Sequence, residues 1–382
     1  MKDHSPPLSF EILSQDPKNG KARTGLMRLG HGTVPTPAFM PVGTLGTVKS
    51  LTPGQLRETG SAICLGNTYH LYLRPGMDII ESHGGLHNFM GWQGPILTDS
   101  GGYQVFSLSS LRKIDEDGVN FRSHIDGSHH RLTPEKSIEI QETLGSDIAM
   151  CFDECPPANA PREDLRKAMA RTTAWAHRCK SAHTRKEQAL FGIIQGGTDQ
   201  ELRQEHAEAI GEIDFDGFAI DGLSVGESHE DLVATTRFTA ALMPENKPRY
   251  LMGVGTPLDL CEAVAAGVDM FDCVMPTRNA RQATAFTSEG KLNLRNRRFR
   301  DDLGPVDPQC KCLCCTNFTR SYIRHLIVAK EILASTLLTI HNLTFYQDLM
   351  RSLRKAIPEG RLDSIVSHHR ALAAQKEQTK SS

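Results

Sequence analysis

The sequence predicts an α/β fold in which eight parallel strands and their crossover helices close into a (β/α)8 barrel. Short apolar runs of strand length recur along the chain, helical patterns separate most of them, and polar residues follow many of their ends. The alternative is a doubly wound open sheet. The sequence favours the barrel because no G-x-G-x-x-G or Walker-type loop follows any apolar run.

The predicted elements begin with a small N-terminal antiparallel sheet. Residues 8–37 carry two hairpin-like turn signals, Lys18-Asn19-Gly20 and Leu29-Gly30-His31-Gly32, and we expect this sheet to cover one end of the barrel. Eight apolar runs follow, with the lengths and compositions of parallel strands buried on both faces. They are residues 39–42, 62–65, 95–98, 148–152, 191–194, 217–220, 250–252 and 269–271.

Helix starts lie between these runs. Thr52-Pro53, Thr133-Pro134 and Thr256-Pro257 each place a capping hydroxyl before a proline at the first helical position. Residues 162–182 form a long helical pattern. We expect one barrel domain over residues 1–382. A subdomain of residues 278–345 is inserted into it near the last barrel strand, because the alternation of strands and helices breaks there.

Composition limits the classes of function. The chain has 382 residues, of which 39% are hydrophobic and 23% charged, and its net charge is −2. A nucleic-acid partner would therefore need a local basic patch. No apolar run approaches the roughly 20 residues of a membrane span, and residues 1–10 lack the apolar core of a signal peptide. We expect a cytoplasmic protein whose cysteines stay reduced.

Four cysteines lie within six positions, and a histidine follows on a later segment. Thiolates at this spacing with an imidazole indicate a tetrahedral Zn²⁺ site, and four protein ligands would make one structural ion per subunit. Buried free cysteines are the alternative, but the run is polar and turn-like. Adjacent residues seldom both bind one ion, so we choose Cys310, Cys312, Cys315 and His341 and leave open whether Cys314 replaces Cys315.

Carboxylates follow three predicted strands, at Asp99, Asp153 and Asp272. Helix capping explains Asp99 and Asp153 equally well, and Asp272 could form a salt bridge with Arg278. Because the carboxyl ends of barrel strands meet at one rim, Asp99 and Asp272 also suggest chemistry at an acetal-like carbon. One carboxylate would attack and the other would move protons. Glycine-flanked loops near Gln195 and residues 222–227 offer polar groups to a planar ligand.

A basic stretch follows Asp272. A solvated surface is the ordinary interpretation of such a run, but its position between a carboxylate and a predicted metal site favours contact with nucleic-acid phosphates. Its residues are Arg278, Arg281, Lys291, Arg295, Arg297, Arg298 and Arg300, with only Glu289 opposing.

Eight short runs and the cysteine–histidine set carry a resemblance to a known family. The runs are GNTYHL (66–71), TDSGGYQ (98–104), FDEC (152–155), QGG (195–197), GLSVGE (222–227), YLMGVG (250–255), FDCV (271–274) and PTRNAR (276–281). In this order they resemble bacterial tRNA-guanine transglycosylase, also called queuine tRNA-ribosyltransferase. The resemblance extends from about residue 34 to residue 341.

The resemblance implies a zinc-containing TIM barrel that works as a homodimer. It implies a pentosyltransferase that exchanges guanine at the wobble position (34) of tRNAs with GUN anticodons, those for Asp, Asn, His and Tyr, around a U-G-U core. The incoming base would be preQ1, a 7-aminomethyl-7-deazaguanine, and the exchange would be a step in queuosine biosynthesis.

The resemblance also implies roles for single residues. Asp272 would attack the ribose C1′ to form a covalent aspartyl-ribose intermediate, and Asp99 would be the general acid and base. The base would be recognised by Asp153, Gln195, the backbone of Gly222 and Leu223, and Glu227. Its two faces would be covered by Tyr103 and Met252. The anticodon loop would be contacted by Arg278 and Arg281.

The chain departs from the family pattern at two places. Asp221 stands where glycine is usual, and Gln282-Ala283 replaces Asn-Gly. Cys155 and Val225 are the bacterial choices and favour preQ1. The alternatives are direct use of queuine, an archaeal-type enzyme for another tRNA position, a non-catalytic zinc- and tRNA-binding subunit, and a glycoside hydrolase. Two retained aspartates argue against the non-catalytic subunit, and the arginine cluster argues against the hydrolase.

Overall fold

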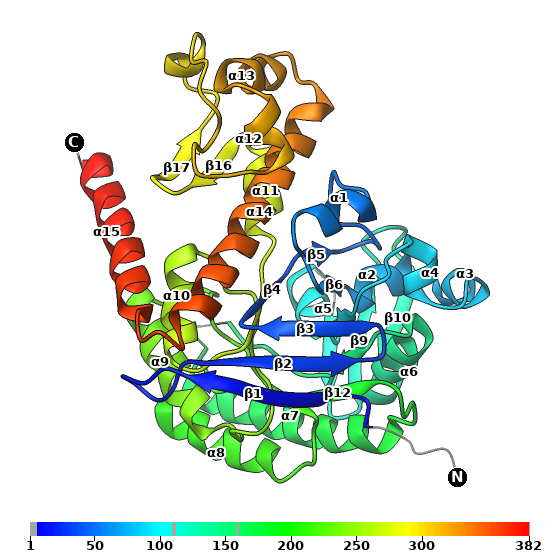
Figure 1. Cartoon of the computed structure of the whole chain (residues 1–382). Helices are drawn as coiled ribbons and strands as arrows, with labels where there is room; N and C mark the ends of the chain where they lie inside the picture. The colour runs from blue at the N-terminus through cyan, green and yellow to red at the C-terminus, as the bar shows by residue number, and fades with distance from the viewer. Residues whose placement is uncertain (1–5, 109–111, 158–159, 382) are drawn as a thin grey trace.

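The computed structural model describes residues 6–108, 112–157 and 160–381, which form a barrel with smaller parts attached to it (Figure 1). One parallel sheet of order β4-β15-β14-β13-β12-β11-β7-β6-β5 makes the barrel wall. Strands β4 and β5 are halves of one extended segment divided at Pro41, so the sheet nearly closes on itself. The strands are β4 (Ala38–Met40), β5 (Val42–Gly43), β6 (Cys64–Gly66), β7 (Ile96–Thr98), β11 (Ile148–Met150), β12 (Ala189–Ile194), β13 (Gly217–Ile220), β14 (Arg249–Leu251) and β15 (Met270–Asp272).

The predicted fold class is therefore confirmed. Each of the eight apolar runs forms a barrel strand, and strands such as β12 and β13 are buried at every position, as parallel strands covered on both faces must be. Consecutive strands of the chain are neighbours in the sheet, which is the connectivity of a (β/α)8 barrel.

Helices cover the outside of the barrel, and the predicted caps are confirmed. The hydroxyls of Thr52, Thr133 and Thr256 each accept a hydrogen bond from a backbone N–H in the first turn of the following helix. The helices up to the last barrel strand are α1 (Pro53–Glu58), α2 (Thr68–Leu73), α3 (Met77–Ser82), α4 (Leu86–Met90), α5 (Gly102–Leu108), α6 (Pro134–Leu144), α7 (Arg162–Ala182), α8 (Gln200–Gly211), α9 (His229–Leu242) and α10 (Pro257–Ala265).

The predicted N-terminal sheet is present, with β1 (Ser9–Gln15), β2 (Arg23–Leu29) and β3 (Gly32–Thr36) antiparallel. It covers the amino-terminal ends of the barrel strands. Arg23 donates to both oxygens of Asp269, just before β15, at 3.0 and 2.6 Å. The ring of His31 lies 2.9 Å from Asp147, just before β11. These contacts close one end of the barrel and leave the carboxyl ends of the strands for the site.

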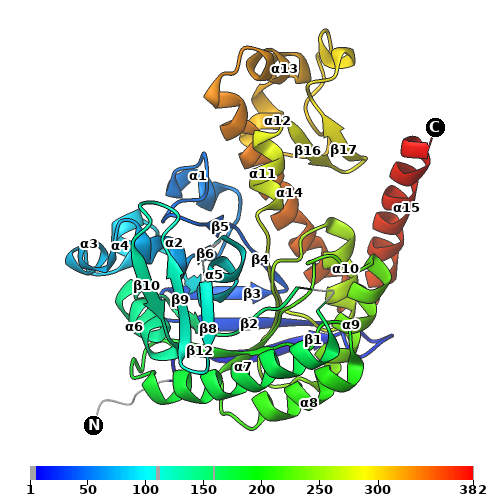
Figure 2. The same ribbon diagram turned by 180° about the vertical axis from the view of Figure 1, so that it is seen from behind.

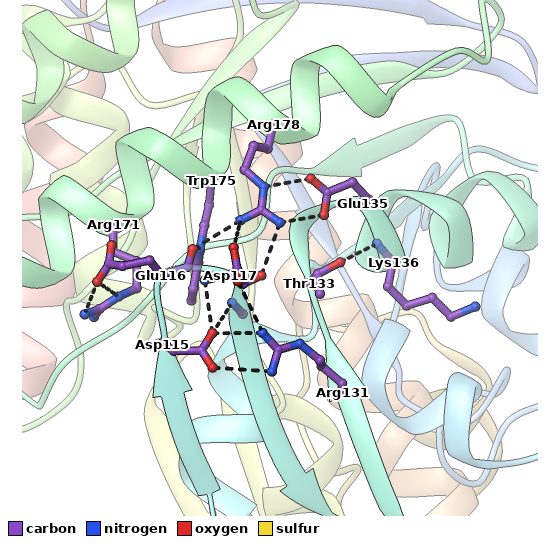
Figure 3. Close-up of polar contacts among 11 residues, drawn as sticks. Asp115, Glu116, Asp117, Arg131, Thr133, Glu135, Lys136, Arg171, Trp175 and Arg178 are labelled. Carbon is purple, nitrogen blue, oxygen red and sulfur yellow. Dashed lines mark hydrogen bonds and ion pairs between the residues drawn. The ribbon is translucent and has the colours of Figure 1, made fainter.

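An antiparallel sheet that the sequence did not predict lies between α5 and α6 (Figure 2). Its strands are short, and β8 and β10 are largely polar, so only β9 carries an apolar alternation, at Val119 and Phe121. Helix α7 holds this sheet at its β8–β9 turn, as Figure 3 shows: the Arg178 guanidinium donates to the Glu116 carbonyl at 3.1 Å, and the Trp175 indole N–H donates to the same carbonyl at 2.8 Å. The strands are β8 (Arg112–Asp115), β9 (Gly118–Arg122) and β10 (His129–Leu132).

The cysteine-rich segment projects from the barrel on the end of a long helix, α14 (Figure 1). The barrel end of α14 replaces a crossover helix, because Gln347 Nε2 donates to the Phe39 carbonyl at 3.0 Å and Tyr346 Oη to that of Gly255 at 2.6 Å. Among the described helices, none combines the length and apolarity that a bilayer span requires. The elements after β15 are α11 (Met275–Arg281), β16 (Thr284–Thr287), β17 (Gly290–Asn293), η1 (Arg297–Phe299), α12 (Leu313–Asn317), α13 (Arg320–Val328), α14 (Ile332–Ala356) and α15 (Leu362–Ser381).

Candidate active site and metal group

The predicted site residues gather at the carboxyl ends of the barrel strands. Since these ends share one rim, residues far apart in the sequence face one ligand. Asp99 follows β7, Asp153 lies beyond β11, Gln195 follows β12, Gly222 lies just beyond β13, Met252 follows β14, and Asp272 ends β15.

Asp99 is a buried carboxylate held by three donors. Its Oδ1 accepts from the Thr68 N–H at 2.9 Å, and its Oδ2 accepts from the side-chain amides of Asn67 at 2.5 Å and Gln104 at 3.1 Å. Burial raises its pKa, the Thr68 N–H opposes the rise, and the negative charge of Asp272 adds to it. The result is a pKa of about 7. Asp99 is therefore poised to gain and lose a proton near neutral pH.

Asp272 is half-buried and is held through one oxygen. Its Oδ1 accepts from the Tyr250 hydroxyl at 2.6 Å and from the Gly253 N–H at 2.8 Å. Among the described residues, Oδ2 has no hydrogen-bond donor. Burial raises the pKa of Asp272, and these two hydrogen bonds work against the rise. A carboxylate with one fixed oxygen and one open oxygen has the geometry of an attacking group.

Asp153 and Gln195 form a third polar group, which Asp221 joins. Gln195 Nε2 donates to Asp153 Oδ2 and to Asp221 Oδ2, both at 2.8 Å. Ser100 Oγ donates to the other oxygen of Asp153 at 3.1 Å. Burial, followed by the charge of Asp221, raises the pKa of Asp153. In the described part of the chain, the buried Oε1 of Gln195 finds no hydrogen-bond partner, so an acceptor is available for a ligand.

The loop of residues 222–227 closes tightly against this group. Gly222 has φ +74°, and a Cβ there would lie 2.5 Å from Gln195 Oε1, so only glycine fits. Leu223 is buried. The Glu227 carboxylate accepts from the backbone N–H of Ser224 and, at 3.0 Å, from that of Val225. Glu227 thus binds its own loop.

The other three predicted contacts differ in their placement. Glu227 also lines an open groove of about 820 Å³ between the loop, α9, α10 and the β16–β17 hairpin. Asp99, Asp153 and Asp272 do not line this groove. Tyr103, on α5, is half exposed. Met252 is half-buried and donates its backbone N–H to the Ile220 carbonyl at 3.0 Å.

The chosen cysteines and the histidine come together. Cys310, Cys312, Cys315 and His341 each offer one ligand atom, and these atoms lie within 4.8 Å of one another. The buried His341 Nε2 lies 2.7 Å from the Phe286 carbonyl and donates to it, which leaves the Nδ1 lone pair facing the thiols, 3.2 Å from Cys315 Sγ. Cys314 is buried outside the group. Three thiols and an imidazole with a fixed tautomer fit a tetrahedral metal ion.

The predicted arginines lie on α11, directly after Asp272. Arg278 is exposed. Arg281 is half-buried, donates to the Thr277 carbonyl at 2.9 Å, and has a pKa lowered by burial and by the charge of Arg278. Exposed Arg295, Arg297, Arg298 and Arg300 continue this basic surface into the cysteine-rich segment.

Comparison with known proteins places the chain in a family. A family model described as "Queuine tRNA-ribosyltransferase" matches residues 16–374. The chain belongs to the queuine tRNA-ribosyltransferase family. The chain is 59% identical over 354 residues to a protein of that name from Francisella tularensis subsp. novicida, covering 93% of this chain and 96% of the relative. A Halothermothrix orenii protein of that name is 57% identical over 355 residues, with 93% and 95% covered. The family consists of enzymes that are pentosyltransferases.

One departure from the family pattern has a structural consequence. Ala283, where the family resemblance implies glycine, has φ +65°, which is the left-handed region. Its carbonyl accepts from the Leu294 N–H at 2.9 Å. The turn after the second arginine therefore keeps a glycine-type conformation although a methyl group occupies it, at a cost of roughly 1 kcal/mol.

Four residues that position the two carboxylates were not predicted as site residues. Asn67, Thr68 and Gln104 position Asp99, and Tyr250 positions Asp272. All four belong to runs shared with the queuine tRNA-ribosyltransferase family, so a signal was present. What the sequence lacked was the pairing of these runs across the rim.

Proposed function

We propose that this enzyme exchanges guanine at position 34 of tRNAs with GUN anticodons for preQ1, through a covalent aspartyl-ribose intermediate. Family membership supports guanine transglycosylation in tRNA. One observation carries the detailed proposal. Buried Asp99 and half-buried Asp272 lie on one rim, the charge of Asp272 raises the pKa of Asp99, and the two carboxylates differ in their hydrogen bonding. Asp99 has a pKa of about 7, whereas Asp272 has an open oxygen.

The first half-reaction uses both carboxylates. Asp272 Oδ2 attacks the ribose C1′, a C–O bond forms, and the C1′–N9 bond to guanine breaks. Asp99 gives its proton to the departing base. The Tyr250 hydroxyl and the Gly253 N–H stay on Oδ1 and hold the ester in place. The intermediate is a ribosyl ester of Asp272, as in retaining glycosidases.

The second half-reaction is the reverse displacement. Asp99 removes the N9 proton of the incoming 7-deazaguanine, N9 attacks C1′, and the ester bond breaks to regenerate the Asp272 carboxylate. Two displacements retain the anomeric configuration. The wobble nucleotide has to leave the loop stack to reach the rim, and Arg278 and Arg281 would hold the neighbouring phosphates while it does.

Recognition of the base is assigned to the third polar group. Asp153, Gln195 and the backbone of Gly222 and Leu223 would contact its edge, and the free Oε1 of Gln195 supports this assignment. Tyr103 and Met252 would cover its two faces. Glu227 would act through the loop, because its carboxylate holds the Ser224 and Val225 N–H groups.

Base exchange itself tests the proposal. A tRNA with a GUN anticodon, incubated with the enzyme and radiolabelled preQ1, should incorporate label at position 34. The same tRNA with adenine at that position should not. Unlabelled queuine should compete poorly, since Cys155 and Val225 are the residues that the family resemblance associates with preQ1. Absence of label from the tRNA, or equal labelling of the adenine control, would refute the proposal.

We further propose that the metal group binds one structural Zn²⁺ and that residues 278–345 form a subdomain organised by it. When bound, the ion would crosslink α12 to α14 through Cys310, Cys312, Cys315 and His341. The arrangement of three thiols around an imidazole with a fixed tautomer supports this proposal. With four protein ligands, no position is left for catalysis at the metal.

The metal proposal predicts different behaviour for two neighbouring cysteines. Replacing Cys315 by alanine should remove about one zinc per chain and lower the melting temperature by several degrees. Replacing Cys314 by alanine, also buried but outside the group, should leave the zinc content unchanged. Metal analysis by mass spectrometry, together with thermal unfolding, measures both effects. Equal zinc contents in the two variants would contradict the ligand assignment.

We also propose that the enzyme is a homodimer. Apolar side chains are exposed on and around α13 in the cysteine-rich segment, where a monomer would leave them in water. Leu303 and Ile332 are exposed at 81% and 80%, and Tyr322 stacks on Phe318 at 5.3 Å beside them. A second copy of the chain would cover this surface.

A further inference from the structure

Asp221 places an additional carboxylate in the candidate active site. It follows β13 directly and stands where the family resemblance implies glycine. Its Oδ2 accepts from Gln195 Nε2 at 2.8 Å, and the same nitrogen donates to Asp153 at 2.8 Å. One amide group therefore bridges two carboxylates and uses both of its hydrogens. Asp221 also lies within hydrogen-bonding reach of the Cys155 thiol.

The charge of Asp221 acts on three neighbouring groups of the rim. It is among the causes that raise the pKa values of Asp153, Asp272 and the Tyr250 hydroxyl. The buried Arg203 interacts electrostatically with Asp221, but its guanidinium donates to the carbonyls of Gly197, Ile194 and Asp221. Among the described residues it forms no ion pair with a carboxylate. Four aspartates, Asp99, Asp153, Asp221 and Asp272, thus lie at the carboxyl ends of the barrel strands.

A ligand that binds the Gln195 Nε2 group, and not only its free Oε1, would leave Asp221 without its partner. A base that takes the Gln195 amide hydrogens removes the only side-chain N–H donor that Asp221 has in the described part of the chain. A half-buried carboxylate without a donor is costly. A positively charged group on the base would replace the lost donor, whereas an uncharged base would not.

We propose that Asp221 is a specificity-determining residue that selects a base carrying a positive charge, such as a protonated aminomethyl group, over uncharged bases. This inference rests on the proposed base exchange. A hydrogen bond to a charged group in such a site corresponds to roughly a 10- to 100-fold preference. The Asp221→Asn variant separates the effect of the negative charge from that of side-chain shape. An asparagine side-chain oxygen still accepts from Gln195 but carries no charge.

The test compares kcat/KM for preQ1 with that for the uncharged 7-cyano analogue of the same 7-deazaguanine. In Asp221→Asn, the ratio of the two values should fall roughly 10- to 100-fold from the wild-type ratio. Asp221→Gly, which restores the usual family residue, should lower it similarly and serves if the asparagine variant folds poorly. Glu230→Gln removes an exposed carboxylate on α9 as a matched charge control and should keep the wild-type ratio.

Titration calorimetry with the two free bases supplies a readout that does not depend on turnover. The preference for preQ1 in binding should shrink in Asp221→Asn by a similar factor. An unchanged ratio in both Asp221 variants would overturn the selectivity proposal and leave base exchange intact. A wild-type enzyme that binds preQ1 more tightly but transfers no base to tRNA would overturn the proposed function instead.

Discussion

Replacing Asp272 by asparagine is expected to lower the rate of base exchange at least about 1000-fold while tRNA binding persists. An amide oxygen is a poor nucleophile toward C1′, so the ester cannot form. The asparagine oxygen still accepts from the Tyr250 hydroxyl and the Gly253 N–H, and the rim keeps its geometry. Single-turnover kinetics and a filter-binding assay for tRNA measure the two properties separately.

Tyr250→Phe is the matched control for this prediction. It removes one hydrogen bond to Asp272 but leaves the carboxylate, so we expect a loss of only about tenfold. Exchange by Asp272→Asn within tenfold of the wild-type rate would contradict the assignment of the nucleophile. A loss of tRNA affinity equal to the loss of rate would assign Asp272 to binding.

Replacing Asp99 by asparagine is expected to slow exchange about 100- to 10,000-fold and to change its pH dependence. Burial, offset by the Thr68 N–H and strengthened by the charge of Asp272, gives the wild-type carboxyl a pKa of about 7. The wild-type rate should therefore depend on a group that titrates near pH 7, and that dependence should vanish in the variant. A pH–rate profile for each enzyme measures it.

The same pKa shift has a consequence for stability with a defined sign. The ordinary pKa of Asp99 is 3.8 and its raised value is about 7, so the unfolded state loses the proton first as the pH rises. The folded wild-type protein therefore loses stability relative to Asp99→Asn between about pH 4 and pH 7, by an amount on the order of 4 kcal/mol. If the difference in unfolding free energy between the two proteins were the same at pH 4 and at pH 8, the pKa of Asp99 would not be raised.

Much of the fold was predictable because its signals are local. The eight apolar runs and the three threonine–proline caps depend on neighbouring residues only, and all of them formed as predicted. The sheet β8–β10 was missed because its strands are short, because β8 and β10 are largely polar, and because the sheet depends on contacts with α7 that lie far away in the sequence. Tertiary contacts, and not local propensity, stabilise such strands.

The candidate site also has a part that the sequence predicts and a part that only the fold creates. The types of residue at the strand ends identified Asp99, Asp153 and Asp272, and the cysteine spacing identified the metal group. Sequence spacing could not show that Asn67 and Gln104 converge on Asp99, or that Gln195 bridges Asp153 and Asp221. Those contacts arise only when separate strand ends meet around the rim. The raised pKa of Asp99 depends on them, because burial and the charge of Asp272 are both tertiary effects.

Trapping of the intermediate tests the central claim most directly. The enzyme is incubated with a GUN-anticodon tRNA and 9-deazaguanine, and the products are separated on a denaturing gel. Wild-type enzyme should give a covalent protein–tRNA band, and peptide mapping should locate the adduct on Asp272. Persistence of that band in Asp272→Asn, or an adduct on any other residue, would contradict the account.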